Sequence, residues 1–318
     1  MVERVVSLIY DWIRPRSSPE LGKILVLSIK KESYPYKFIL ENFELPFLNA
    51  VKIQDLTKVE LYLKLGVNVN CASEEDGDTA LHIAASNGDY KMVYVILQQH
   101  NVNIHMKNKE RCVPLHMCLN DSHLAIVNLL LENKANPNSV DRFGNTPLHM
   151  AARLSSTKLA RLLLKYGAIL NIFNVMERTP LHIALLEAPY FLFVEILVSN
   201  GAELEHEVGS LPLFLEAVLS CHSYEQLQII FYLMNKGINV NVIEKFTKKN
   251  ALHFVAMTCH TPLAIELLKY GVDPEHKDFR GRRPLDVAME HRNESMCYIL
   301  ENYKTILRLI RRTSTRFL

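Results

Sequence analysis

The chain has 318 residues, of which 49% are apolar and 22% are charged. This composition is that of a folded globular protein and excludes disorder as the main state. The 36 basic and 34 acidic residues leave a net charge of only +2, whereas nucleic-acid-binding proteins usually carry a strong positive charge. We therefore expect no nucleic-acid partner.

The sequence also argues against a membrane or secreted protein. Its apolar runs, such as Ile24 to Ile29, are far shorter than the roughly 18 residues that span a bilayer. Asp11 interrupts the first apolar stretch, which is atypical of a secretory signal. The six cysteines contain no Cys-x-x-Cys pair and are expected to be free thiols of a reducing compartment. We expect a cytoplasmic protein, with the nucleus as an alternative location.

Two helices are predicted in residues 1–44. The first covers Val2 to Ile13 and the second runs from Glu20 to about Lys30, after a Ser-Pro pair. The favoured interpretation is an N-terminal helical cap that covers the core of the following segment. The alternative is a helix that docks a partner through Trp12, the only tryptophan of the chain.

From residue 45 onward, a four-residue motif recurs along the chain. Residues 146–149 and 179–182 read Thr-Pro-Leu-His, residues 79–82 read Thr-Ala-Leu-His, and residues 113–116 read Val-Pro-Leu-His. Weaker copies lie at 45–48, 211–214, 250–253 and 283–286. Successive copies are 32–34 residues apart, except for one interval of 39. Eight copies at this spacing predict eight structural repeats.

Each copy carries the signals of a helix pair. Threonine before proline is typical of a helix start, because threonine caps free backbone N–H groups and proline lacks one. About twenty residues later a glycine follows an apolar stretch in five copies, which predicts a left-handed cap at the end of a second helix. Turn-forming residues such as 141–145 then lead to the next copy. The five glycines are Gly66, Gly167, Gly201, Gly237 and Gly271.

With this repeat length and the Thr-Pro-Leu-His signature, the chain resembles the ankyrin repeat family over about 45–303. The resemblance implies an all-α solenoid of stacked helix-turn-helix units with β-hairpin fingers, and a concave surface that binds another protein. The first, sixth and eighth copies are degenerate. The family also implies that the motif histidine hydrogen-bonds between adjacent repeats, a structural role expected for His82, His116, His149, His182 and His253.

Three regions depart from the repeat. The interval from Pro212 to Gly237 is 25 residues, against 20 from Pro147 to Gly167, so we expect an insertion in the turn between the helices, near 221–225. In the last copy Asp286 replaces the histidine, as in a terminal capping repeat. Residues 304–318 form a basic tail with five cations and no acid, interpreted as a solvated helix end or as a contact for an acidic partner or anionic lipid.

Nothing in the sequence predicts catalysis. Phosphate-binding loops, dinucleotide-binding glycines, nucleophile elbows and zinc-protease motifs are all missing from it. We therefore expect a non-enzymatic protein without a cofactor or a metal site.

The fingers contain the candidate binding residues. Three phenylalanines lie beside Arg or Lys at turn positions, and such residues dominate binding hot spots. Each ring either faces solvent or folds back onto a neighbouring hairpin. The predicted partner-binding residues are Arg142, Phe143, Glu177, Arg178, Phe246, Lys248, Phe279 and Arg280.

These observations predict a monomeric scaffold or adaptor that binds a protein of unknown identity. The alternatives are a substrate-recruiting subunit of a ubiquitin ligase and a pathogen effector, with residues 1–44 or 304–318 contacting other machinery. The family resemblance also implies that finger asparagines can be hydroxylated, and the candidates are Asn138, Asn171 and Asn241.

Overall fold

The computed structural model describes residues 43–205, 207–208, 211–258 and 260–314. The two helices predicted within residues 1–44, and Trp12, lie outside the described residues. Of the predicted N-terminal cap, the structure describes only residues 43 and 44. The chain divides into two compact parts, Met1–Arg142 and Phe143–Leu318, which we call the N-terminal part and the C-terminal part.

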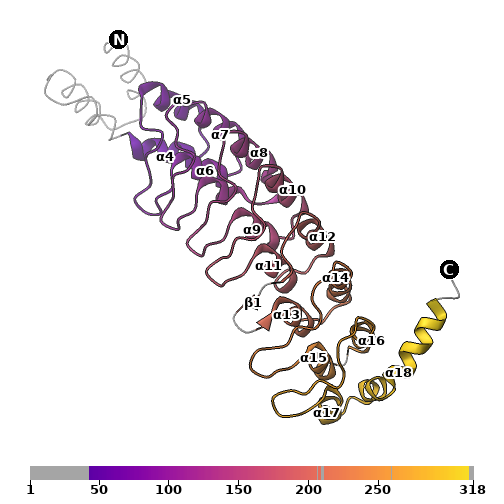
Figure 1. The fold of residues 1–318 in the computed structure, drawn as a ribbon. Helices are drawn as coiled ribbons and strands as arrows, with labels where there is room; N and C mark the ends of the chain where they lie inside the picture. Colours follow the sequence, from indigo (N-terminus) through magenta and orange to yellow (C-terminus); the bar gives the residue numbers. More distant parts are fainter. Residues whose placement is uncertain (1–42, 206, 209–210, 259, 315–318) are drawn as a thin grey trace, which may run out of the picture. The chain divides into compact units, whose positions relative to one another are not determined.

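The N-terminal part stacks its helices in two rows (Figure 1). The inner row packs α4 on α6 and α6 on the 3-10 helix η1, and each inner helix also packs on its own outer helix. Phe47, Leu81, Met92 and Leu130 are fully buried between the rows. The elements are α4 (Glu44–Lys52), α5 (Leu56–Leu65), α6 (Ala80–Ser86), α7 (Tyr90–Leu97), η1 (Pro114–Cys118), η2 (Asp121–His123) and α8 (Leu124–Glu132).

The C-terminal part repeats this arrangement with five helix pairs. Neighbouring inner helices pack on one another, and Leu148, Leu163, Phe193 and Phe214 are fully buried in the resulting core (Figure 1). The inner helices are α9 (Pro147–Arg153), α11 (Pro180–Leu186), α13 (Leu213–Leu219), α15 (Ala251–Thr258) and α17 (Pro284–Glu290). The outer helices are α10 (Thr157–Lys165), α12 (Phe191–Ser199), α14 (Tyr224–Asn235), α16 (Thr261–Lys269) and α18 (Glu294–Ser314). Strands β1 (Glu207–Val208) and β2 (Leu211–Pro212) pair antiparallel.

Helix boundaries follow the predicted signals. Thr146 and Thr179 have extended backbones directly before α9 and α11, which begin at Pro147 and Pro180. All five glycines predicted as left-handed caps have φ between 84° and 95°. Both predictions are confirmed, and these signals mark the start of α9 and α11 and the end of five outer helices.

The third repeat departs from the predicted α-helix. Residues Pro114–Cys118 form only a short 3-10 helix. Asn120 has an extended backbone, and its side-chain oxygen accepts a hydrogen bond from the His123 backbone N–H at 3.0 Å. This cap starts the next element early and leaves no room for a further turn of the first helix. Cys118, the last residue of this 3-10 helix, is fully buried.

The extra residues of the sixth repeat lie mainly in a helix and not in the predicted turn. Helix α14 has 12 residues, whereas α10, its counterpart in the fourth repeat, has 9. The loop between α13 and α14 contains only residues 220–223. Ser223 caps α14 and accepts a hydrogen bond from the Gln226 backbone N–H at 3.1 Å, which places the start of the helix before the extra turn.

The last helix runs on through most of the predicted basic tail. Helix α18 covers Glu294–Ser314 without interruption, so the boundary predicted at residue 304 falls inside a helix. Within the residues that the structure describes, no helix combines the length and apolarity required to span a bilayer.

Candidate protein-binding surface

Three of the five motif histidines hydrogen-bond to the finger of the following repeat. The Nε2–H of His82 donates a hydrogen bond to the Cys112 carbonyl at 2.9 Å. The corresponding group of His149 donates to the Arg178 carbonyl, and that of His253 to the Arg282 carbonyl, each at 3.0 Å. Nδ1 of each ring accepts a hydrogen bond from the backbone N–H three residues earlier. The ring is therefore neutral and protonated on Nε2. For these three residues the implied structural role is confirmed.

Burial maintains the neutral form of these rings. Burial lowers the pKa of His82, whose side chain is fully buried. The hydrogen bond to the Cys112 carbonyl raises this pKa and offsets part of the effect. The pKa of His253 is lowered in the same way. A proton on Nδ1 would also remove the acceptor of a backbone N–H, so the charged form is disfavoured by two effects.

One polar side chain, half-buried in two cases and buried in the third, shapes each of three fingers from within. The side-chain oxygen of Asn108 accepts hydrogen bonds from two backbone N–H groups of its finger, at 2.9 and 3.0 Å. Asn174 does the same, with both bonds at 3.0 Å, and Asp278 accepts two at 2.9 Å. These bonds pair two backbone N–H groups of each turn with a side chain of the same finger.

Neighbouring fingers are linked by backbone hydrogen bonds. In the N-terminal part, the N–H of Arg142 donates to the Glu110 carbonyl at 3.0 Å. In the C-terminal part, Val175 donates to Phe143 and Phe279 donates to Thr247, each at 2.9 Å. Each linked pair of fingers therefore presents its tips side by side.

The predicted residue Arg142 belongs to the N-terminal part, where it is held by an acid. Its guanidinium lies 2.5 Å from a carboxylate oxygen of Glu110, and both side chains are about half exposed. The other seven predicted residues belong to the C-terminal part.

The predicted residue Phe143 belongs to an apolar patch whose other members were not predicted from the sequence. Phe143 is 51% exposed, and its finger neighbours Val175 and Met176 are 73% and 63% exposed. Phe173 is 42% exposed. We call these four residues the apolar finger patch. Its signal in the sequence was three apolar residues, Phe173, Val175 and Met176, in a stretch whose counterparts 73–76 and 107–110 are entirely polar.

Glu177 and Arg178, in the same finger, differ from each other. Glu177 is exposed and has a left-handed backbone, with φ of 58°. Arg178 is largely buried, because its guanidinium contacts Glu187 at 3.1 Å and Glu216 at 3.5 Å. Burial raises the pKa of Glu216, whereas Arg178 lowers it. Arg178 therefore joins a finger to the inner helices α11 and α13 instead of standing free at a tip.

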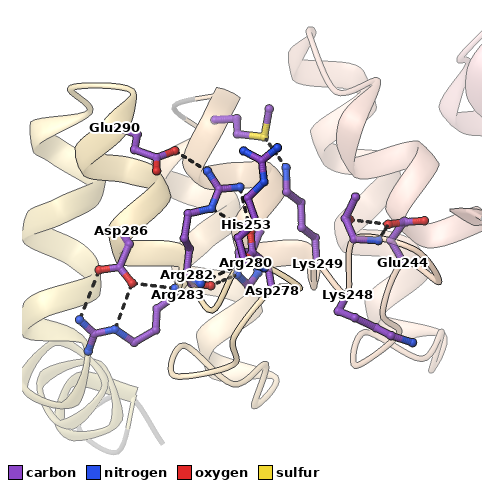
Figure 2. Close-up of polar contacts among 12 residues, drawn as sticks. Glu244, Lys248, Lys249, His253, Asp278, Arg280, Arg282, Arg283, Asp286 and Glu290 are labelled. Atoms are coloured by element: carbon purple, nitrogen blue, oxygen red, sulfur yellow. Dashed lines mark hydrogen bonds and ion pairs between the residues drawn. The ribbon is translucent and has the colours of Figure 1, made fainter.

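The remaining four predicted residues lie on two adjacent fingers. Phe246 and Phe279 are 71% and 58% exposed, so neither ring is buried against a hairpin. Lys248 and Arg280 are also exposed, and Figure 2 shows them around the inward-pointing carboxylates of this region. The Arg280 guanidinium lies 5.2 Å from the centre of the Phe279 ring.

This arrangement offers contact surfaces. Across the described part of the chain, no group of three or more histidine, cysteine or acidic side chains is placed to hold a metal ion. The exposed groups are instead aromatic, aliphatic and cationic side chains on linked, preformed fingers, a combination suited to binding another polypeptide.

Comparison with known proteins identifies the repeat. A family model described as ankyrin repeats, in three copies, matches residues 47–141, 115–207 and 217–308. The chain belongs to the ankyrin repeat family. Ankyrin repeat proteins bind other proteins through their stacked units, and the chain is a protein-interaction domain of this kind.

Several matches are IkappaB-like proteins. The B-cell lymphoma 3 protein of Homo sapiens is 28% identical over 270 residues, which is 81% of this chain and 58% of that protein. I-Kappa-B like protein C2 of the Microplitis demolitor bracovirus is 29% identical over 84 residues, 26% of this chain and 46% of that protein. The chain thus spans about half the length of these curated relatives.

Solved ankyrin domains share the fold. The ankyrin repeat domain of Bcl-3, described as a unique member of the IkappaB protein family, superimposes with a TM-score of 0.61 at 28% identity, over 70% of this chain and 100% of that one. The human ASB11 ankyrin repeat domain gives 0.57 at 25% identity, over 70% and 97%.

Proposed function

We propose that this chain is a non-enzymatic, IkappaB-like adaptor that holds a partner protein on the fingers and inner helices of its C-terminal part. The apolar finger patch is the observation that carries the proposal. Its four side chains are between 42% and 73% exposed on two hydrogen-bonded fingers. Contiguous apolar surface of this kind is characteristic of interaction sites, because its burial by a partner is strongly favourable.

The rest of the surface supports a partner of this type. Arg178, Glu187 and Glu216 form a charged network on the inner helices directly beside the patch finger, and Arg153 extends it by a 3.2 Å contact with Glu187. An apolar centre flanked by charged groups is the usual composition of a protein interface. The five cysteines of the described chain are free, and we place the adaptor in the cytoplasm or the nucleus on this basis.

Affinity purification with a matched pair of variants tests the proposal. The variant V175D/M176D puts two charges into the patch, whereas the control L192D/Y224D changes two exposed side chains of the outer helices α12 and α14, which are 47% and 74% exposed. We expect the tagged wild-type chain and the control to retain the same co-purifying protein and the patch variant to lose it.

Two results would contradict this assignment. Equal recovery by all three chains would place the binding surface elsewhere. Recovery of ubiquitin-ligase components that depends on residues 304–318 would favour the alternative of a ligase subunit.

A further inference from the structure

We propose that the last two fingers, residues 244–249 and 276–282, form a docking site for an acidic segment of a partner polypeptide. The inference rests on the proposed function and names the chemistry that these two fingers recognise. We call this surface the basic finger patch. It consists of Lys245, Phe246, Lys248, Lys277, Phe279 and Arg280.

The two acids of these fingers point inward. Glu244 is 7% exposed and its carboxylate accepts hydrogen bonds from the backbone N–H groups of Phe246 and Thr247 and from the Thr247 hydroxyl. Asp278 is 5% exposed and accepts four bonds, two from backbone N–H groups and two from the Arg282 guanidinium. These hydrogen bonds, acting against burial, lower the pKa of both carboxyls. Both acids are therefore ionised but withdrawn from the surface.

The cations of the same fingers point outward and are not neutralised. Lys245, Lys248, Lys277 and Arg280 are exposed, and none forms an ion pair with a carboxylate in the described part of the chain. The nearby Arg282 and Arg283 behave differently, because Asp278, Glu290, Asp286 and Glu275 hold them in ion pairs (Figure 2). The patch thus presents four exposed cations outside any ion pair of the described chain, while the two acids of its fingers are buried. An acidic ligand complements this surface.

Two aromatic rings lie among these charges. Phe246 and Phe279 are 71% and 58% exposed, and the N–H of Phe279 donates to the carbonyl of Thr247, next to Phe246. Exposed rings beside cations bind apolar side chains while the cations bind carboxylates. The ligand that fits is therefore an acidic segment that also carries apolar or aromatic side chains.

The backbone at Lys248 is strained but accepts different side chains. Lys248 has a left-handed backbone, with φ of 56°, and Arg111 and Glu177 have φ of 60° and 58° at the same finger position, where Gly77, Gly144 and Gly281 have φ between 75° and 77°. An L residue incurs a steric penalty of about 1–2 kcal/mol in this conformation, which glycine avoids. The position therefore holds a charged side chain of either sign at the finger tip.

A polypeptide fits these fingers better than a nucleic acid does. A single-stranded nucleic acid follows a continuous basic groove over several nucleotides. Here the cations are confined to two fingers, and the exposed acids Asp273 and Glu275 lie in the same repeat. The chain also belongs to a family that binds proteins.

A labelled peptide provides the test. The probe is a fluorescein-labelled peptide in which Asp and Glu surround one Phe and one Leu, and its control replaces every acid by the matching amide. We expect anisotropy titrations to show at least tenfold tighter binding of the acidic peptide, falling several-fold as salt rises from about 0.05 M to about 0.5 M.

Variants locate the site. K248E/R280E should weaken acidic-peptide binding about tenfold or more, because two attractive charges become repulsive. Glu is tolerated at the strained position, as Glu177 shows in its own finger. K158E/R161E makes the same change of charge at exposed residues of α10 and should leave binding within about twofold of wild type. Thermal melts of both variants verify that they are folded.

Several outcomes would overturn the inference. They are equal binding of the acidic and amide peptides, no effect of K248E/R280E, equal weakening by K158E/R161E, and a single-stranded oligonucleotide that binds the same patch more tightly than the peptide. Salt-sensitive self-association lost in K248E/R280E would identify a second copy of the chain as the ligand instead. The peptide assay and the V175D/M176D purification are independent, so the failure of one is distinguishable from the failure of the other.

Discussion

Replacing Asp278 should destabilise the last finger and the helix pair that follows it. The Asp278→Ala change removes four hydrogen bonds of 2.9–3.0 Å, two to backbone N–H groups and two to the Arg282 guanidinium. A hydrogen bond to a charged group contributes about 1.5–3 kcal/mol. Arg282 keeps its ion pair with Glu290, and water can reach part of the finger, so we expect a loss of about 3 kcal/mol and not the full sum.

The Asp278→Asn change separates the two functions of this side chain. Its amide oxygen can still accept both backbone bonds, as the oxygens of Asn108 and Asn174 do in other fingers of the chain. The amide NH2 that replaces the second carboxylate oxygen cannot accept from the Arg282 guanidinium, so the charge and these two bonds are lost. We expect a cost of about 1–2 kcal/mol.

Urea denaturation followed by circular dichroism measures both changes, with the exposed Glu301→Ala on α18 as a control. The reasoning is refuted if Asp278→Ala costs less than about 1 kcal/mol, or if Asp278→Asn is as damaging as Asp278→Ala. In the second case the charge, and not the backbone bonds, would be the stabilising feature.

Three further predictions concern pH, thiol reactivity and glycine. Burial holds the pKa of His82 below its ordinary 6.5, so as the pH falls the unfolded chain binds a proton before the folded chain does. The contribution of His82 to stability should therefore be complete above pH 6.5 and decrease below it. Thermal melts should show this decrease, and it should be smaller in His82→Gln. Burial raises the pKa of Cys71 and Cys118 to about 12, so iodoacetamide should leave both thiols unmodified in the native chain, as peptide mass spectrometry would show. Gly144→Ala should cost about 2–3 kcal/mol and Gly167→Ala about 1 in urea titrations, because both have positive φ but only the first places Cβ 3.1 Å from a neighbouring finger.

The repeat architecture could be predicted because its key residues have few alternative uses. A glycine after an apolar helix, or a proline after threonine, has a specific backbone conformation, and the structure places both as expected. The role of the motif histidine came from the family resemblance, and in the structure the two ring nitrogens of His149 meet two backbone groups.

What the sequence did not predict depends on competition between neighbouring groups. Asn120 could have continued a helix, but its cap on His123 ended η1 instead. The insertion of the sixth repeat could have formed a loop, but the Ser223 cap made it helical. The left-handed backbones of Glu177 and Lys248 could have been predicted from the sequence, because these residues occupy the finger position where other repeats have Gly144 and Gly281.

Arg178 and Arg280 show why the sequence alone could not separate binding residues from structural ones. Both are finger arginines next to a residue with positive φ or an aromatic ring, and both were predicted to bind the partner. The difference lies in which side chains the nearest acids contact. Glu187 and Glu216 reach Arg178 from the inner helices, whereas Asp278 turns toward Arg282 and leaves Arg280 free. A finger cation is therefore available to a partner only when the acids around it are used elsewhere, and this depends on packing between repeats and not on residue type.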